Sequence, residues 1–132
     1  MGAFVEWRSY YSVGEPALDA EHQQILGFID ELYAAMTVGQ QNTKTIVLLD
    51  QLVQYTLNHF QHEERIMREC DYPQLSAHRA EHERMKQRTL DIRTNIEVVT
   101  NRDILQFLKD WWTNHIQDVD KSYSPYLAMM VH

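Results

Sequence analysis

The stretch His59-Phe60-Gln61-His62-Glu63 and the later stretch His78-Arg79-Ala80-Glu81-His82 each repeat a metal-ligating residue type at a spacing of four. Residues four apart in an α-helix lie on the same face, one turn apart. If both stretches are helical, His59 points the same way as Glu63, and His78 the same way as His82. Imidazole and carboxylate groups that converge in this way are typical ligands of transition metals.

The apolar residues on either side of these stretches also repeat at helical spacing. They predict four helices, over about 19–38, 42–70, 74–98 and 101–121. Asp19 is the expected N-cap of the first helix, and Thr100 or Asn101 that of the fourth. No alternation typical of strands competes with these periods, so the fold class is all-α.

The connections between the predicted helices are short, and short connections join antiparallel neighbours. We therefore expect one domain over residues 1–132, built as an antiparallel up-down-up-down four-helix bundle. An irregular N-terminal arm, 1–18, carries aromatic residues that we expect to pack on the bundle. Residues 122–132 are expected to form a tail.

Composition narrows the class of function. The chain has 132 residues and a formal net charge of −7, which disfavours a general nucleic-acid or anionic-membrane role because phosphates would be repelled. The only cysteine, Cys70, rules out an intrachain disulfide and fits a reducing compartment. No signal peptide or apolar run long enough for a membrane span is evident, so a cytoplasmic location without membrane insertion is expected.

Six ligand-type residues fall inside the apolar stripe of their predicted helix: His22, His59, Glu63, His78, His82 and His115. A single core histidine is more often a hydrogen-bonded structural group than a ligand. Five of them on four helices favour a shared site. In an antiparallel bundle the starts of the first and third helices lie beside the ends of the second and fourth, so all six positions are expected at one end. His62 and Glu64 lie off this face and are expected to be solvated.

Asp120 is a seventh candidate, but it follows His115 by five residues, which in a regular helix turns it about 140° away. It can join the cluster only if the helix loosens locally, as in a π-bulge, or ends so that the side chain folds back. The alternative is a surface acid near a helix terminus. Spacing alone slightly favours that alternative.

Five imidazoles and two carboxylates exceed what one ion can bind, and they suit two transition-metal ions. If each carboxylate bridges both ions and one oxide or hydroxide bridges them too, one position of two octahedra stays open. A small diatomic ligand fits such a position.

The ordered pattern His22, His59-x-x-x-Glu63, His78-x-x-x-His82 and His115-x-x-x-x-Asp120 resembles the hemerythrin family, in particular its single-domain bacterial members. Trp7, the Tyr72-Pro73 turn and Trp111 resemble it too. The resemblance implies a non-haem di-iron centre, with a bridging oxide or hydroxide, that binds O2 reversibly. It also implies that His78, His82 and His115 hold one iron, that His22 and His59 hold the iron with the open position, and that Glu63 and Asp120 bridge.

Four apolar side chains near these positions are candidates to line an O2 pocket: Ile25, Phe60, Trp111 and Ile116. Ordinary core packing explains them equally well. Trp112 stands where an aliphatic residue is common in the family. The first functional hypothesis is O2 carriage, storage or delivery without catalysis. The alternatives are a di-iron enzyme that acts on peroxide or nitric oxide, and an oxygen or iron sensor that works through a partner protein.

Overall fold

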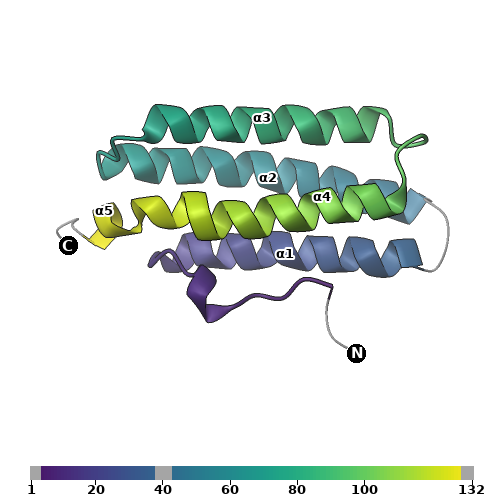
Figure 1. Cartoon of the computed structure of the whole chain (residues 1–132), viewed down its shortest axis with the longest axis horizontal. Helices are drawn as coiled ribbons and strands as arrows, with labels where there is room; N and C mark the ends of the chain where they lie inside the picture. Colours follow the sequence, from purple (N-terminus) through teal and green to yellow (C-terminus); the bar gives the residue numbers. More distant parts are fainter. Residues whose placement is uncertain (1–3, 38–42, 129–132) are drawn as a thin grey trace.

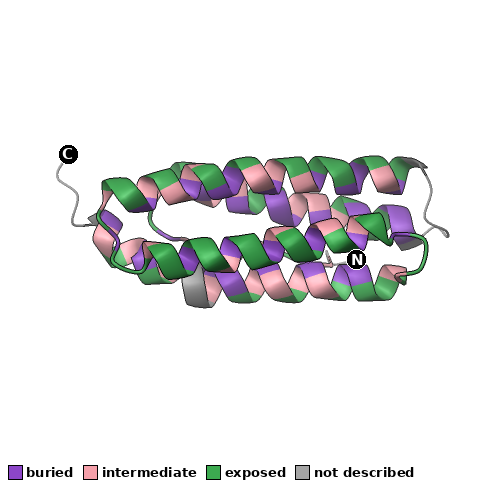
Figure 2. Cartoon of the chain, turned by 90° about the horizontal axis from the view of Figure 1, so that it is seen from above, coloured by how far each residue is buried: buried purple, intermediate pink, exposed green. Residues whose placement is uncertain are grey.

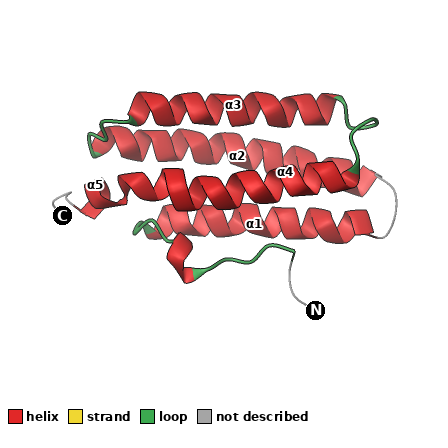
Figure 3. Ribbon diagram, viewed as in Figure 1, coloured by secondary structure: helices red, strands yellow, loops and turns green. Residues whose placement is uncertain are grey.

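A computed structural model describes residues 4–37 and 43–128, and its four main helices run antiparallel as a bundle (Figure 1). These helices are α1 (Pro16–Thr37), α2 (Thr43–Glu69), α3 (Leu75–Thr94) and α4 (Asn101–Asn114). The arm contains the 3-10 turn η1 (Ser9–Tyr11), and α4 is followed by the π-helical turn η2 (His115–Val119), the 3-10 turn η3 (Asp120–Tyr123) and the short helix α5 (Ser124–Ala128). Every regular element in the described residues is a helix (Figure 3), which confirms the predicted all-α bundle.

Buried and exposed residues alternate along the long helices (Figure 2), and the buried apolar residues form two clusters. The larger cluster includes Ile25, Phe60 and Met85, and the smaller one includes Leu18 and Met67. In α1, His22 lies between Leu18 of the smaller cluster and Ile25 of the larger one, and in α2, Glu63 lies between Phe60 of the larger cluster and Met67 of the smaller one. A polar centre is thus enclosed by apolar packing on both sides. No helix within the described ranges is long and apolar enough to cross a membrane.

The start of α1 differs from the expectation. The helix begins at Pro16, a residue suited to the first helical position because its missing N–H would have no intrahelical partner. Glu15 precedes it, and the Glu15 carboxylate accepts a hydrogen bond from the backbone N–H of Ala17 at 3.0 Å. Asp19 is therefore not the N-cap. It accepts hydrogen bonds from Ser12 Oγ (2.5 Å) and from the N–H of Val13 (2.9 Å), which tie the arm to the first turn of the helix.

α2 ends at Glu69, one residue before the predicted end, and α3 begins at Leu75, one residue after the predicted start. Residue 38, the predicted end of the first helix, and residue 42, the predicted start of the second, lie outside the described residues. The predicted third helix, 74–98, ends at Thr94 instead. Asn95 is its C-cap: the backbone N–H and the side-chain amide of Asn95 both donate to the Asp91 carbonyl, at 3.1 and 2.8 Å, and a turn follows in which the N–H groups of Val98 and Val99 donate to the Asn95 carbonyl. Thr100 caps α4, accepting from the N–H of Asp103 at 3.1 Å as predicted.

The last predicted helix does not continue regularly to residue 121. The α-helical part ends at Asn114 and a π-helical turn takes over at His115. Side chains satisfy carbonyls in this region: Thr113 Oγ donates to the Lys109 carbonyl at 2.7 Å, and Gln117 Nε2 donates to the Thr113 carbonyl at 3.1 Å. Such local bonds compete with the regular ladder and favour a loosened turn. The π-bulge named as one of two routes for Asp120 is present.

The arm packs along α1, and its last residues contact the segment that follows α4. The expected packing of the arm is observed: Phe4 stacks on Tyr33 with ring centroids 4.6 Å apart, whereas Tyr10 stays 55% exposed. Within the predicted tail, 122–132, Ser124–Ala128 form the short helix α5. Ser124 Oγ donates to the Val13 carbonyl at 2.7 Å, so α5 is fastened to the arm.

Candidate metal centre

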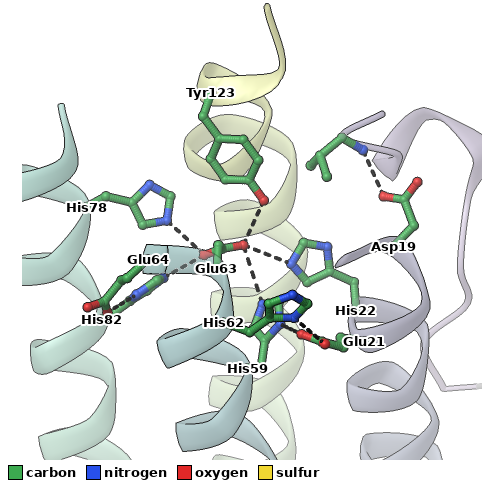
Figure 4. A network of polar contacts seen from close by, with 11 residues as sticks. Asp19, Glu21, His22, His59, His62, Glu63, Glu64, His78, His82 and Tyr123 are labelled. Atoms are coloured by element: carbon green, nitrogen blue, oxygen red, sulfur yellow. Dashed lines mark hydrogen bonds and ion pairs between the residues drawn. The ribbon is translucent and has the colours of Figure 1, made fainter. Parts of the chain in front are cut away.

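Six of the seven predicted ligand side chains meet at one end of the bundle, five of which are visible in Figure 4. They are His22 from α1, His59 and Glu63 from α2, His78 and His82 from α3, and His115 from η2. Each of these side chains is at most 3% exposed. The helix starts and ends therefore converge as the antiparallel topology predicts.

Glu63 lies at the middle of this centre, and its two carboxylate oxygens face different histidines (Figure 4). Oε1 is 3.1 Å from Nε2 of His78 and 2.9 Å from Nε2 of His82. Oε2 is 3.4 Å from Nε2 of His22 and 3.4 Å from Nε2 of His59. A single carboxylate thus belongs to two sets of imidazoles, which is the geometry of a bridging ligand.

The side chains form two groups that could each bind a metal ion, and Glu63 is a member of both. One group is Glu63, His78, His82 and His115, and the other is His22, His59 and Glu63. Within each group the donor atoms lie within 4.8 Å of one another. This division into three and two histidines is the one that the family resemblance implies, and it follows here from distances alone.

The inner ring nitrogens fit the presence of metal ions. Nε2 of His59 and Nε2 of His82 are buried, and within the described part of the chain neither makes a hydrogen bond of acceptable geometry. A buried polar atom without a partner is costly. Each of these nitrogens faces the shared carboxylate, so a cation between them would satisfy both. The buried nitrogen and carboxylate donors are ones that transition metals accept.

The ionisation of the centre favours a charged carboxylate. Burial raises the pKa of the Glu63 carboxyl, but the neighbouring imidazoles, above all His59, outweigh burial and hold this pKa well below its usual range. Burial lowers the pKa of His82, yet the nearby carboxylates of Glu63 and Glu64 outweigh burial and raise that pKa above its usual value. The two shifts therefore favour an ionised Glu63 and stabilise the protonated form of His82.

Glu21 was not predicted from the sequence, and it fixes the orientation of His59. Nδ1 of His59 donates to Glu21 Oε1 at 2.7 Å, which leaves Nε2 facing Glu63. The other oxygen of Glu21 accepts from Nδ1 of His62 at 2.6 Å. We expected His62 to be solvated because it lies off the face of His59. Instead it is a half-buried hydrogen-bond partner of Glu21. The helical spacing of α2 gave no signal for a partner on α1.

Glu64 orients His82 as Glu21 orients His59. We expected Glu64 to be solvated, but its side chain is only 20% exposed. Nδ1 of His82 donates to Glu64 Oε2 at 2.8 Å, and the guanidinium of Arg79 is 3.3 Å from Glu64 Oε1. A carboxylate on the outer nitrogen of a metal-ligating histidine fixes its tautomer and strengthens it as a donor. Each group thus has one histidine held in this way.

Tyr123 also contacts the centre and was not predicted. Its phenol O–H donates to Glu63 Oε2 at 2.8 Å, and both side chains are fully buried (Figure 4). The residue lies in η3, beyond the π-helical turn, where periodicity no longer specifies which way a side chain points. Only the position of this irregular segment on the bundle reveals the contact.

The four predicted pocket residues lie where the apolar core meets the histidines. Phe60 stacks on His82 with ring centroids 3.8 Å apart and planes 8° from parallel, and Trp111 stacks on His115 at 4.2 Å and 14°. Ile25 and Ile116 are fully buried in the larger apolar cluster. The rings of Phe60 and Trp111 therefore cover imidazoles as well as filling the core.

The side chain of Asp120 lies outside the described part of the structure. Its backbone begins η3, directly after the π-helical turn that starts at His115. Single π-helical turns occur frequently at functional sites. The backbone condition for bringing Asp120 into the centre is met, and its role as a ligand stays a prediction.

The fold and the centre define a class: a four-helix bundle with a paired, buried cation-binding site at one end. Comparison with known proteins agrees, since the family model "Hemerythrin HHE cation binding domain" matches residues 13–127. The chain belongs to this hemerythrin family.

Individual relatives cover most of the chain. A bacteriohemerythrin of Methylococcus capsulatus is 32% identical over 113 residues, which is 83% of this chain and 86% of that protein. A bacteriohemerythrin of Stenotrophomonas maltophilia is 28% identical over 124 residues, 92% of this chain and 80% of that protein. The crystal structure of a wild-type hemerythrin matches with a TM-score of 0.87 at 28% identity, covering 96% of this chain and 99% of that one.

Proposed function

We propose that this protein binds O2 reversibly at a di-iron centre and serves O2 carriage, storage or local delivery. The observation that carries the proposal is the pair of buried ligand groups that share Glu63. Membership of the hemerythrin family supports it. Two ferrous ions in such a centre can supply the two electrons that O2 takes up on binding and recover them on release.

In this proposal the ligands divide as the two groups do. His78, His82 and His115 would hold one iron, and His22 and His59 would hold the other. Glu63 and Asp120 would serve both ions, together with an oxide or hydroxide. The group with two histidines has fewer protein donors, so O2 would bind on that side.

The chain's own side chains favour carriage over catalysis. The donor set is mostly nitrogen, whereas ferritin-like di-iron enzymes use Glu-x-x-His pairs, a pattern that the sequence lacks. Phe60 and the two buried isoleucines, Ile25 and Ile116, exclude water from the imidazoles. Because water promotes oxidation of ferrous iron to the inactive ferric state, its exclusion should slow that oxidation.

The experiment that tests this function is an anaerobic O2 titration. The purified protein is assayed for iron per chain, reduced, and exposed to successive O2 pulses and inert-gas flushes. We expect two irons per chain and a visible charge-transfer band that appears and disappears with O2. A protein that carries only zinc, or one that bleaches irreversibly with each pulse, contradicts carriage, and rapid turnover of peroxide favours the enzyme alternative.

A first prediction concerns Glu21. Replacing Glu21 by Ala is expected to weaken binding of divalent metal by about 10- to 100-fold, because His59 loses the carboxylate that fixes its tautomer. Competition with a chelator of known affinity measures the change. His62→Ala is the matched control: it removes the other partner of Glu21 and should leave two metals per chain. An equal loss in both variants would mean that His62 itself reaches the centre.

A second prediction concerns pH. A histidine must be neutral to bind metal, and His82 has a raised pKa in the metal-free protein. Metal uptake is therefore expected to release protons, and apparent affinity should fall as pH drops below that pKa, by about tenfold per pH unit for each proton displaced. A pH indicator in weakly buffered solution counts the protons. Affinity that is independent of pH, with no protons released, contradicts the assignment of His82.

A further inference from the structure

We propose that Tyr123 is a positioning residue of the metal centre, which holds the shared carboxylate of Glu63 so that each oxygen faces its own group of histidines. The inference rests on the proposed two-metal site. Tyr123 acts through Glu63 and is not itself a ligand. The observation behind it is a charge-assisted hydrogen bond between two fully buried side chains.

The phenol bonds the carboxylate at one of its two oxygens. Tyr123 O–H donates to Oε2 of Glu63 at 2.8 Å, and Oε2 is the oxygen that faces His22 and His59, each at 3.4 Å. The other oxygen, Oε1, faces His78 and His82. Because hydrogen bonds to an ionised oxygen are among the strong ones, this contact opposes rotation of the carboxylate. It also withdraws electron density from the oxygen that serves the group with two histidines.

The fold fixes the tyrosine ring from several directions. The ring centroid of Tyr123 lies 5.8 Å from that of His78 and 6.1 Å from that of Tyr72. The next residue, Ser124, is fastened to the Val13 carbonyl at 2.7 Å. A ring held in this way keeps its O–H on Glu63 without losing further side-chain entropy, which is what a positioning group requires.

The alternative is that the hydrogen bond between Tyr123 and Glu63 only stabilises the fold, and this alternative predicts a different result. Removal of the hydroxyl would then lower the stability of the fold and leave metal binding unchanged. A positioning role requires that metal affinity falls, and that it falls more for one of the two ions. The affected ion is the one that binds at His22, His59 and Oε2 of Glu63.

The test uses the full chain and the variant Tyr123→Phe, which removes the hydroxyl and keeps the ring. Tyr126→Phe is the matched control, because Tyr126 packs on Tyr72 in the same apolar cluster. Co2+ alone is the probe, titrated against a chelator. We expect the weaker of two Co2+ binding steps to lose about tenfold or more in Tyr123→Phe and to stay within about twofold in the control. An unchanged weaker step in Tyr123→Phe overturns the proposal.

Ultraviolet resonance Raman spectroscopy of the metal-free protein supplies a second readout that involves neither metal nor O2. The difference between wild type and Tyr123→Phe should show the tyrosine doublet of a strong hydrogen-bond donor. If Tyr123→Phe does not fold, Glu63→Gln probes the same bond from the acceptor side, because the Tyr123 doublet should then change towards a weaker donor. A doublet without donor character, or one unaffected by Glu63→Gln, overturns the proposal.

The outcomes separate this inference from the proposed function. A protein that binds two Co2+ ions with reduced affinity in Tyr123→Phe supports the inference even if its iron form does not release O2. A protein that binds two Co2+ ions equally well with and without the hydroxyl contradicts the inference alone. A protein that takes up no Co2+ contradicts both.

Discussion

Replacing Glu63 by Gln is expected to abolish paired metal binding while the metal-free fold persists. Among the side chains that the structure describes, Glu63 alone belongs to both ligand groups, so its loss removes one donor from each. An amide offers a single oxygen, and its NH2 group would face imidazole nitrogens where an anionic oxygen is needed. The variant should therefore carry fewer than two metals per chain, as measured by elemental analysis.

The stability of this variant separates metal binding from folding. Removing one partner of a buried ion pair costs about 3–5 kcal/mol when the other partner stays charged. The imidazoles around Glu63 can release a proton, so the variant should lose some stability but still fold without metal. Wild-type protein should gain about 2.7 kcal/mol for each bound metal when free metal reaches about 100 times the dissociation constant of that site. Glu63→Gln should gain clearly less in total, and urea unfolding with and without Co2+ measures both values.

Glu69→Gln provides the control for this prediction. Glu69 is the same residue type on the same helix, and its side chain is 56% exposed. It should bind two metals and gain the same stability as wild type. Two tightly bound metals in Glu63→Gln would show that this carboxylate is not the bridge.

The parts of the site that could be predicted from the sequence are those governed by helical periodicity. The spacing of four places His59 with Glu63 and His78 with His82, and antiparallel topology brings both pairs to one end of the bundle. The spacing of five between His115 and Asp120 was less informative: it slightly favoured a surface acid and left a loosened helix as one way for Asp120 to join the site, and a π-helical turn does begin at His115.

The parts that could not be predicted depend on contacts between elements. Glu21 reaches His59 across two helices, and Tyr123 reaches Glu63 from an irregular segment after the last long helix. No spacing within one helix encodes either contact. These two contacts can be identified only when the positions of the helices relative to one another are known.

The predicted ends of α1 and α3 differ from the structure for another physical reason. Ile92 and Ile96 continue the apolar period of α3, and both are 7% exposed, yet the helix ends at Thr94 between them. Ile96 stays buried in the turn that follows. The chain turns after Asn95, where the N–H groups of Val98 and Val99 donate to the Asn95 carbonyl, and Asp19 bonds the arm rather than capping its helix. Periodicity reports burial, and burial continues past the end of a helix.

Replacing Phe60 by Ala is expected to destabilise the metal-free protein by about 3–5 kcal/mol. Phe60 is 4% exposed, stacks on His82 at 3.8 Å between ring centroids, and lies 5.7 Å from the Trp112 ring. Truncation removes the contacts of the ring and leaves a cavity beside an imidazole. Urea unfolding of the metal-free protein measures the loss.

Phe60→Leu separates packing from protection of the centre. Leu restores most of the apolar volume, so its cost should be clearly smaller than that of Ala. It cannot reproduce the flat face, 8° from parallel, that covers the ring of His82. If Phe60 shields the centre from water, the iron form of Phe60→Leu should oxidise in air faster than wild type despite its near-normal stability. Oxidation rates that follow stability alone across the two variants would leave Phe60 with a packing role only, because a shielding ring must affect the reduced centre even where the fold is intact.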